Sequence, residues 1–189
     1  MGLPIPLIPQ LPEGKNFGLL ARFENAQTIY TACEKVRDAG YTKWDSHTPF
    51  PVHGLDHAMG VKASKLPWLV LITGLSGATG GMLLQWWVSV HAYPLVISGK
   101  PLFSWPAFVP VTFELGVLFG ALGAVFGMFA FNQLPMLFHP LFSSKAFARA
   151  TDDGFFISIE SWDPKYDETQ TAALLREAGA VDVEVVENG

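Results

Sequence analysis

Three histidines and two aspartates are concentrated in one short segment, and imidazole and carboxylate groups are common metal ligands. The residues are Asp45, His47, His53, Asp56 and His57. The spacing of His53 and His57 would place both side chains on one face of a helix. Gly54 and two prolines in the segment oppose a continuous helix, and a second ligand pair at the usual zinc spacing is missing. The sequence therefore favours a hydrogen-bonded loop that shapes the fold over a metal site.

Two further titratable residues lie within or beside apolar sequence. Glu114 stands in an apolar stretch, where a charged carboxylate costs several kcal/mol unless it is paired. It could relay protons, anchor the chain to another subunit, or extend to the membrane interface. His139, in the segment LPMLFHPLF, could order the chain at that interface or admit protons. Glu114 and His139 are therefore the candidates for a proton path.

The signatures of known active sites are missing from the sequence. A single cysteine, Cys33, cannot form an internal disulfide, a four-cysteine zinc site or a cysteine-ligated iron–sulfur cluster. The sequence contains no Walker motif, no GxSxG motif, no GxGxxG motif after a strand, and no histidine pair in an apolar stretch that could ligate haem. We expect a chain without catalytic residues and without its own cofactor.

The distribution of charge predicts a membrane protein. The 12 basic and 17 acidic residues give a net charge of −5, which excludes a surface for nucleic acid. Only 15% of residues are charged, and none lies between Lys65 and Lys100. Residues 66–90 and 111–131 are each long enough to cross a bilayer as a helix, and a loop rich in proline and aromatic residues joins them. We expect a transmembrane hairpin over residues 66–131.

Basic residues flanking the two spans set the expected orientation, because lysine and arginine are retained on the cytoplasmic side. Lys62 and Lys65 precede the first span, Lys145 and Arg149 follow the second, and the connecting loop carries Lys100 alone. Both termini and the polar segments should therefore face the cytoplasm, with the hairpin in the bacterial inner membrane. Residues 1–16 lack a basic start and contain four prolines, which predicts an extended arm and not a signal peptide.

Small residues recur along both spans at the GxxxG spacing, which exposes backbone on one helix face and allows close helix packing. The pairs are Gly77 and Gly81, Gly116 and Gly120, and Gly123 and Gly127. Two alternatives remain open from the sequence. The glycines could seal the hairpin to itself, or they could dock it against a larger helical bundle.

The polar segments on either side of the spans have the same pattern of elements. Alternating apolar residues predict strands at 17–23, 41–46, 155–159 and 181–185. Helical stripes lie between the strands of each half, and each helix ends in Ala-Gly. We expect residues 17–65 and 132–189 to pair into a four-stranded, ferredoxin-like α+β domain of the split βαβ type, which the transmembrane hairpin interrupts.

Three segments carry a family resemblance: DSHTPFPVHGLDHAMGVKASKLPW at 45–68, NQLPMLFHPLF at 132–142 and FARATDDGFFISIESWDP at 147–164. Together they resemble ActD, the two-span subunit of bacterial alternative complex III, a quinol-oxidising respiratory complex. The family motif falls on the following residues of this sequence: Thr48, Pro49, Phe50, Pro51, His53, Gly54 and Asp56, with His139 and Pro140 in the later segment.

The resemblance implies an accessory subunit of an electron-transport complex. Haem c and iron–sulfur clusters would belong to partner subunits, namely a multi-haem cytochrome and an iron–sulfur protein. The hairpin would contact lipid and a large quinol-interacting membrane subunit, and support assembly there. One alternative is a role in a proton pathway through Glu114 and His139, and another is a free-standing metal-binding membrane protein.

Overall fold

The computed structural model describes residues 16–136 and 138–187, and their contacts divide the chain into two compact units. The first is a helix hairpin formed by residues 63–135. The second, here called the sheet domain, contains residues 16–62, 136 and 138–187. The arm predicted for residues 1–16 lies outside the described residues except for Asn16, which begins the first strand.

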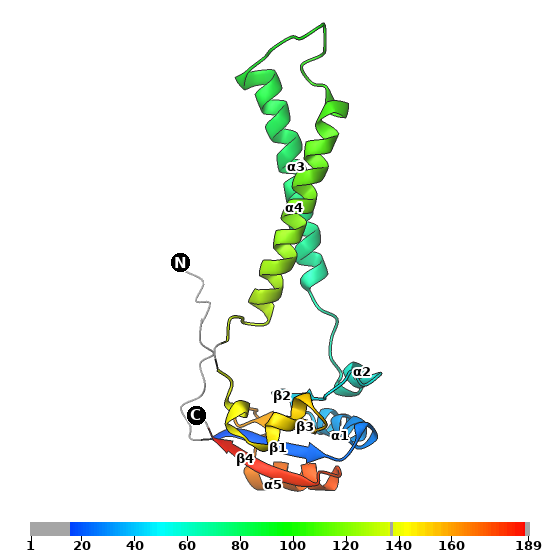
Figure 1. The fold of residues 1–189 in the computed structure, drawn as a ribbon, viewed down its shortest axis with the longest axis vertical. Coiled ribbons are helices and arrows are strands. Elements are labelled where there is room, and N and C mark those ends of the chain that lie inside the picture. The colour runs from blue at the N-terminus through cyan, green and yellow to red at the C-terminus, as the bar shows by residue number, and fades with distance from the viewer. Residues whose placement is uncertain (1–15, 137, 188–189) are drawn as a thin grey trace. The chain divides into compact units, whose positions relative to one another are not determined.

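The sheet domain is built on a four-stranded antiparallel sheet. Its strands are β1 (Asn16–Phe23), β2 (Trp44–His47), β3 (Phe155–Glu160) and β4 (Asp182–Glu187), in the spatial order β2-β3-β1-β4 (Figure 1). β1 lies between β3 and β4, with Ala21 opposite Ile157 on one side and Val183 on the other. The sheet therefore joins strands from both polar segments of the sequence.

Two helices, α1 (Ala26–Ala39) and α5 (Glu168–Glu177), cover one face of this sheet. The side chain of Asn25 caps α1 by accepting the backbone N–H groups of Gln27 and Thr28. Gly40 ends the helix with φ 82°, a left-handed conformation that favours glycine. Apolar residues at helical spacing on α1 pack against alternating residues of β1 and β3, as the sequence predicts: Ile29, Cys33 and Val36 against Leu19, Ala21, Ile157 and Ile159.

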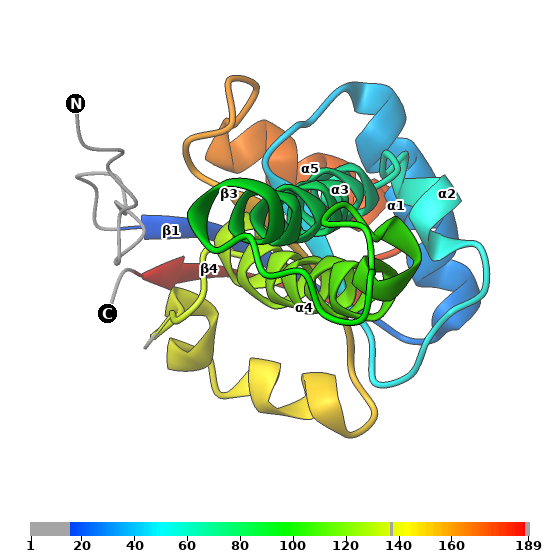
Figure 2. The same ribbon diagram turned by 90° about the horizontal axis from the view of Figure 1, so that it is seen from above.

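The opposite face of the sheet is also covered, by two short 3-10 helices that the sequence pattern does not indicate. These are η2 (Pro140–Ser143) and η3 (Ala146–Thr151), which lie across the sheet from α1 and α5 (Figure 2). They form a second core with residues of β1, β3 and β4, whose buried members are Phe17, Leu20, Leu141, Phe147, Ala150, Phe156 and Val186. Both faces of the central strands β1 and β3 are thus buried.

The hairpin consists of α3 (Leu66–Trp87), which continues as the π-helical turn η1 (Val88–Ala92), and α4 (Trp105–Phe131). The two helices pack against each other, with contacts from Leu66 and Gly127 to Gln85 and Phe108, and they cross in the view of Figure 1. With η1 included, each contains 27 residues and is apolar enough to cross a membrane. A helix of this length extends about 40 Å, which exceeds a hydrocarbon core of about 30 Å.

The second span begins earlier than predicted. The sequence places its start at residue 111 because Pro106 and Pro110 indicate a loop, but α4 starts at Trp105 and includes both prolines. Pro106 lies in the first turn, where backbone N–H groups have no partner within the helix, so its missing N–H costs no hydrogen bond. The connecting loop is correspondingly shorter than the predicted 92–110.

Candidate functional site

The six glycines with GxxxG spacing all face the neighbouring helix of the hairpin. They are Gly77, Gly81, Gly116, Gly120, Gly123 and Gly127. A Cβ added at Gly77 would overlap the carbonyl oxygen of Leu115 and lie 2.7 Å from Cβ of Phe119. One added at Gly81 would lie 2.8 Å from Cδ1 of Leu115. Cβ atoms do not come this close to their neighbours without a shift of one of them, so glycine at these two positions permits close contact between α3 and α4.

A polar side chain also ties the two helices together. The amide nitrogen of Gln85, on α3, donates to the carbonyl oxygen of Phe108 at 3.1 Å and lies 3.3 Å from the hydroxyl of Thr112, both on α4. It also donates to the carbonyl oxygen of Gly81 within its own helix. Interhelical hydrogen bonds of this kind stabilise packing in lipid. The sequence pattern does not predict this contact, and its one local sign is that Gln85 is a polar residue within an apolar span.

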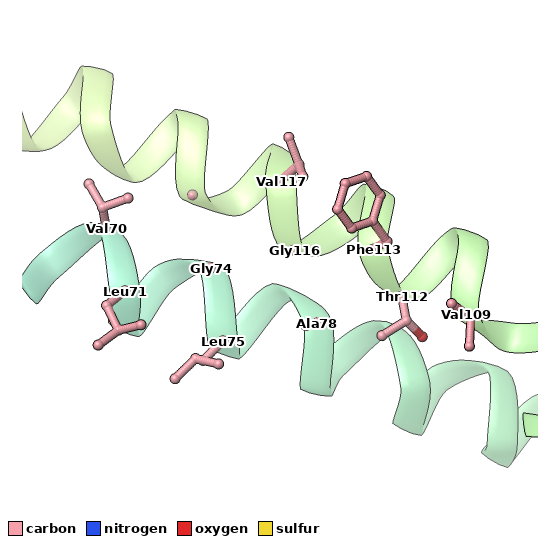
Figure 3. Close-up of a pocket in the computed structure, with 11 residues that line it drawn as sticks. Val70, Leu71, Gly74, Leu75, Ala78, Val109, Thr112, Phe113, Gly116 and Val117 are labelled. Carbon is pink, nitrogen blue, oxygen red and sulfur yellow. The ribbon is translucent and has the colours of Figure 1, made fainter. Parts of the chain in front are cut away.

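An apolar groove runs between α3 and α4 on one side of the hairpin. It has a volume of about 540 Å³ and is lined by residues from both helices (Figure 3). Its floor is formed by the small residues Gly74, Ala78 and Gly116. Its walls are formed by the larger side chains of Val70, Phe113 and Val117. Among the lining residues Thr112 supplies the one hydroxyl group. The groove is suited to an apolar surface such as a helix or a lipid chain.

Glu114 lies on α4 but outside this groove, and its side chain is exposed. Thr112 and Gly116, two positions before and after it, face α3, and a step of two residues turns a helix by about 200°. Glu114 therefore points away from α3. Because α4 starts at Trp105, Glu114 is about 14 Å along the helix, deeper in the span than the sequence prediction placed it.

The motif loop, residues 48–56, is held in place by its own backbone and by β3. The hydroxyl of Thr48 donates to the carbonyl oxygen of Phe50 at 2.9 Å. The ring of Phe50 packs edge-on against Phe155, with 5.5 Å between ring centroids. Gly54, with φ 79°, starts the short helix α2 (Leu55–Met59), whose Ala58 is fully buried against the core. The loop is thus a structural part of the sheet domain.

The guanidinium of Arg37 fixes this short helix from α1. It donates to the carbonyl oxygens of His57 and Ala58 at 3.1 Å each, at the carboxyl end of α2. His53 and His57 are exposed and line an open depression of about 480 Å³ beside Tyr30. No group of three or more His, Cys, Asp or Glu side chains placed to hold a metal ion occurs within residues 16–136 and 138–187.

His47 and His139 lie at the second core of the sheet domain, where burial affects their titration. The Nε2 atom of His47 is 3.2 Å from the hydroxyl oxygen of Ser158, and its ring packs edge-on against Phe147. Burial lowers the pKa of His47, while Asp45 opposes the shift and His139 adds to it. Burial lowers the pKa of His139 as well, again opposed by Asp45. Both imidazoles are therefore neutral at pH 7.

This arrangement predicts that mild acid destabilises the sheet domain. A histidine whose pKa is lowered by folding binds a proton more readily when unfolded, so stability falls as the pH drops below about 6.5. Between pH 7.5 and 5.5 the loss is up to about 1.4 kcal/mol for His47. Pulse proteolysis of the intact protein in urea at the two pH values measures it. His47→Gln should reduce this pH dependence, and an unchanged dependence would contradict the assignment.

A buried carboxylate that the sequence analysis did not single out connects the two polar segments. One oxygen of Asp163 accepts the backbone N–H groups of Thr42 at 2.6 Å and Lys43 at 2.7 Å, together with the hydroxyl of Thr42. The other oxygen accepts the N–H of Lys165 at 2.8 Å. Although burial opposes it, this set of donors lowers the pKa of Asp163. The same bonds hold residues 42 and 43 toward Asp163 outside the sheet ladder, and β2 starts at Trp44 and not at the predicted residue 41.

Comparison with known proteins relates most of the chain to one protein family. No curated protein sequence matches the chain. The family described as alternative complex III, ActD subunit, matches residues 17–185. This range includes the motif loop, both long apolar helices and all four strands, apart from the first residue of β1 and the last two of β4. The match covers most of the chain and agrees with the resemblance found in the motif segments. The chain therefore belongs to the ActD family of alternative complex III subunits.

Proposed function

We propose that this chain is a non-catalytic accessory subunit that inserts its hairpin into the bacterial inner membrane and packs it against the large quinol-interacting subunit of the complex. The observation that carries the proposal is the hairpin surface. The glycines and the hydrogen bonds of Gln85 already hold α3 and α4 together. An apolar groove of about 540 Å³ nevertheless remains open between the two helices. A partner helix in that groove would gain packing contacts that lipid chains make less well.

The orientation proposed for the hairpin follows the basic residues at its ends. Lys62 and Lys65 lie before α3, and Lys145 and Arg149 lie after α4. The sheet domain would then face the cytoplasm together with both termini. We infer that this domain is a ferredoxin-like split βαβ fold interrupted by the hairpin, since the strand order β2-β3-β1-β4 fits two strand–helix–strand units.

The proposed partners supply the redox chemistry. In this view a multi-haem cytochrome and an iron–sulfur subunit carry haem c and iron–sulfur clusters, and this chain supports their assembly with the membrane subunits. Membership in the ActD family supports this division of roles, as does the use of the chain's buried polar groups for structure. Cys33 is an example: burial raises its pKa to about 12, so its thiol remains protonated within the core.

Removing the chain tests the accessory role. In a strain that lacks it, we expect the recovery of assembled complex to fall, and quinol oxidation by the membranes to fall in proportion. A plasmid copy of the wild-type chain is the control and should restore both. Recovery of an intact complex with full activity and normal assembly in the deleted strain would contradict the proposal.

A role in a proton pathway is the competing function, and it gives a different result. It requires Glu114 or His139 to change proton translocation per electron in a complex that assembles normally. Glu114→Gln and His139→Ala, introduced separately, test it when proton uptake and quinol oxidation are measured on the same vesicles. An unchanged ratio in both variants removes the support for this alternative.

A further inference from the structure

Glu114 is an ionisable residue of the hairpin for which the described part of the chain supplies no partner. The ion pairs present within residues 16–136 and 138–187 are Arg37–Asp38 and Arg149–Asp153, both in the sheet domain. No hydrogen bond reaches the Glu114 side chain from these residues, and the side chain is exposed on the surface of α4. Whatever satisfies this carboxylate comes from outside the described chain.

The length of α4 places Glu114 inside the hydrocarbon region. The helix extends about 40 Å against a core of about 30 Å, so about 10 Å lies outside the core at the two ends combined. Glu114 is about 14 Å from the start of α4. If all of the extra length of α4 lies at its Trp105 end, Glu114 is still about 4 Å inside the core. If the extra length is divided equally between the two ends, Glu114 is about 9 Å inside the core. A charged carboxylate at that depth costs several kcal/mol unless it is paired, and a group of opposite charge is the pairing partner that removes most of this cost.

The surface around Glu114 allows another helix to approach. On an α-helix, positions four and seven residues away lie on the same face, and here they are Ala107, Pro110, Leu118 and Ala121. All four are exposed, and three of them, Ala107, Pro110 and Ala121, have compact side chains. Leu118 is 47% exposed, and Val111 and Val117, three residues before and after Glu114, are 42% and 54% exposed. A partner helix can therefore come close enough for a direct ion pair.

We propose that the Glu114 face of α4 docks on a transmembrane helix of a partner subunit that presents an arginine or lysine side chain at the depth of Glu114. This inference rests on the proposed function, because it identifies the chemistry of the partner that the hairpin meets. Charge complementarity selects the occupant, since a basic side chain in the membrane has the same need for a counter-charge as Glu114. The groove lies on a different side of α4 and remains available to a second contact.

The test captures the complex through a tag at the carboxyl terminus of this chain and measures the yield of co-purified subunits. Relative to wild type, we expect Glu114→Lys to reduce that yield more than tenfold, because two basic groups then face each other. Glu114→Gln, which is nearly the same size, should reduce it several-fold, and Glu114→Asp should retain most of it. Ile72→Ala is the control, because Ile72 is 61% exposed on α3 outside this face and outside the groove, and it should have little effect. Immunoblots of the membranes verify that each variant is inserted at the wild-type level.

A charge reversal at the partner's basic residue should restore the yield of the Glu114→Lys variant, which would identify that residue. Equal yields from wild type, Glu114→Gln and Glu114→Lys would overturn the inference. A full yield from Glu114→Gln combined with a loss from Glu114→Lys would also overturn it, since a neutral hydrogen bond would then suffice. If the wild-type chain captures no other subunit, the proposed function itself fails, and the two failures are thus distinguishable.

Discussion

Replacing Gly77 by leucine will force α3 and α4 apart. Even a methyl group at this position would overlap the carbonyl oxygen of Leu115 and lie 2.9 Å from Cγ of Phe119. A backbone carbonyl cannot rotate away as the end of a flexible side chain can, so the helices must separate. Overpacking of this kind costs about 1–3 kcal/mol, and the leucine is larger than the methyl group that already clashes.

A disulfide between the helices measures this separation. An added Cβ at Gly116 would lie 3.3 Å from Cβ of Ala78, which is close to the distance that a disulfide bridges. The pair Ala78→Cys and Gly116→Cys should therefore form a disulfide readily on mild oxidation. The native Cys33 is buried and its pKa is about 12, so it should not compete.

Gly80 provides the matched control on the same helix. An added Cβ there would have no neighbouring atom within 4 Å, so Gly80→Leu should leave the yield of the disulfide unchanged. Gly77→Leu should reduce it several-fold in the same detergent. Equal disulfide yields in the two leucine variants would show that the glycine contacts do not determine the packing of the hairpin.

Replacing Asp163 by alanine should destabilise the sheet domain by about 3 kcal/mol. The change removes the acceptor for three backbone N–H groups and leaves those of Thr42 and Lys43 without their partner, each at a cost of about 1–3 kcal/mol unless water replaces it. Asp163 is 5% exposed, so water has little access to the site. Pulse proteolysis of the intact protein across a urea titration provides the measurement.

Asp153→Ala is the matched control, because that carboxylate is exposed and pairs with Arg149 on the surface. Such a pair contributes about 1 kcal/mol or less. The pH dependence gives a second readout. The lowered pKa of Asp163 means that its stabilising effect is present above the ordinary value of 3.8 and is lost as the pH falls through the lowered value. If Asp163→Ala costs no more than Asp153→Ala, the carboxylate does not connect the two segments as described.

The sequence predicted those elements whose signal is local. Alternation of apolar residues located β1, β3 and β4 to within two residues, and Asn25 and Gly40 marked the ends of α1. The long uncharged runs likewise located both apolar helices. The start of α4 was placed wrongly because prolines near a helix start are compatible with either a loop or a helix.

The features that the sequence missed depend on contacts between distant residues. The bonds from Thr42 and Lys43 to Asp163 join positions more than a hundred residues apart, and no local pattern marks them. The same holds for the second core, where Phe147 packs against Phe156 and His47. For the candidate site, GxxxG spacing identified glycines at a helix contact but could not tell which helix they meet; the structure assigns them to the α3–α4 contact.

The most direct test of the proposed function is affinity capture of this chain from gently solubilised native membranes, with mass spectrometry and a count of haem and iron in the eluate. We expect a multi-haem cytochrome, an iron–sulfur subunit and large membrane subunits to co-purify with it in fixed proportion. Elution of the chain as a monomer or homo-oligomer without haem and iron would contradict a role as an accessory subunit of the complex.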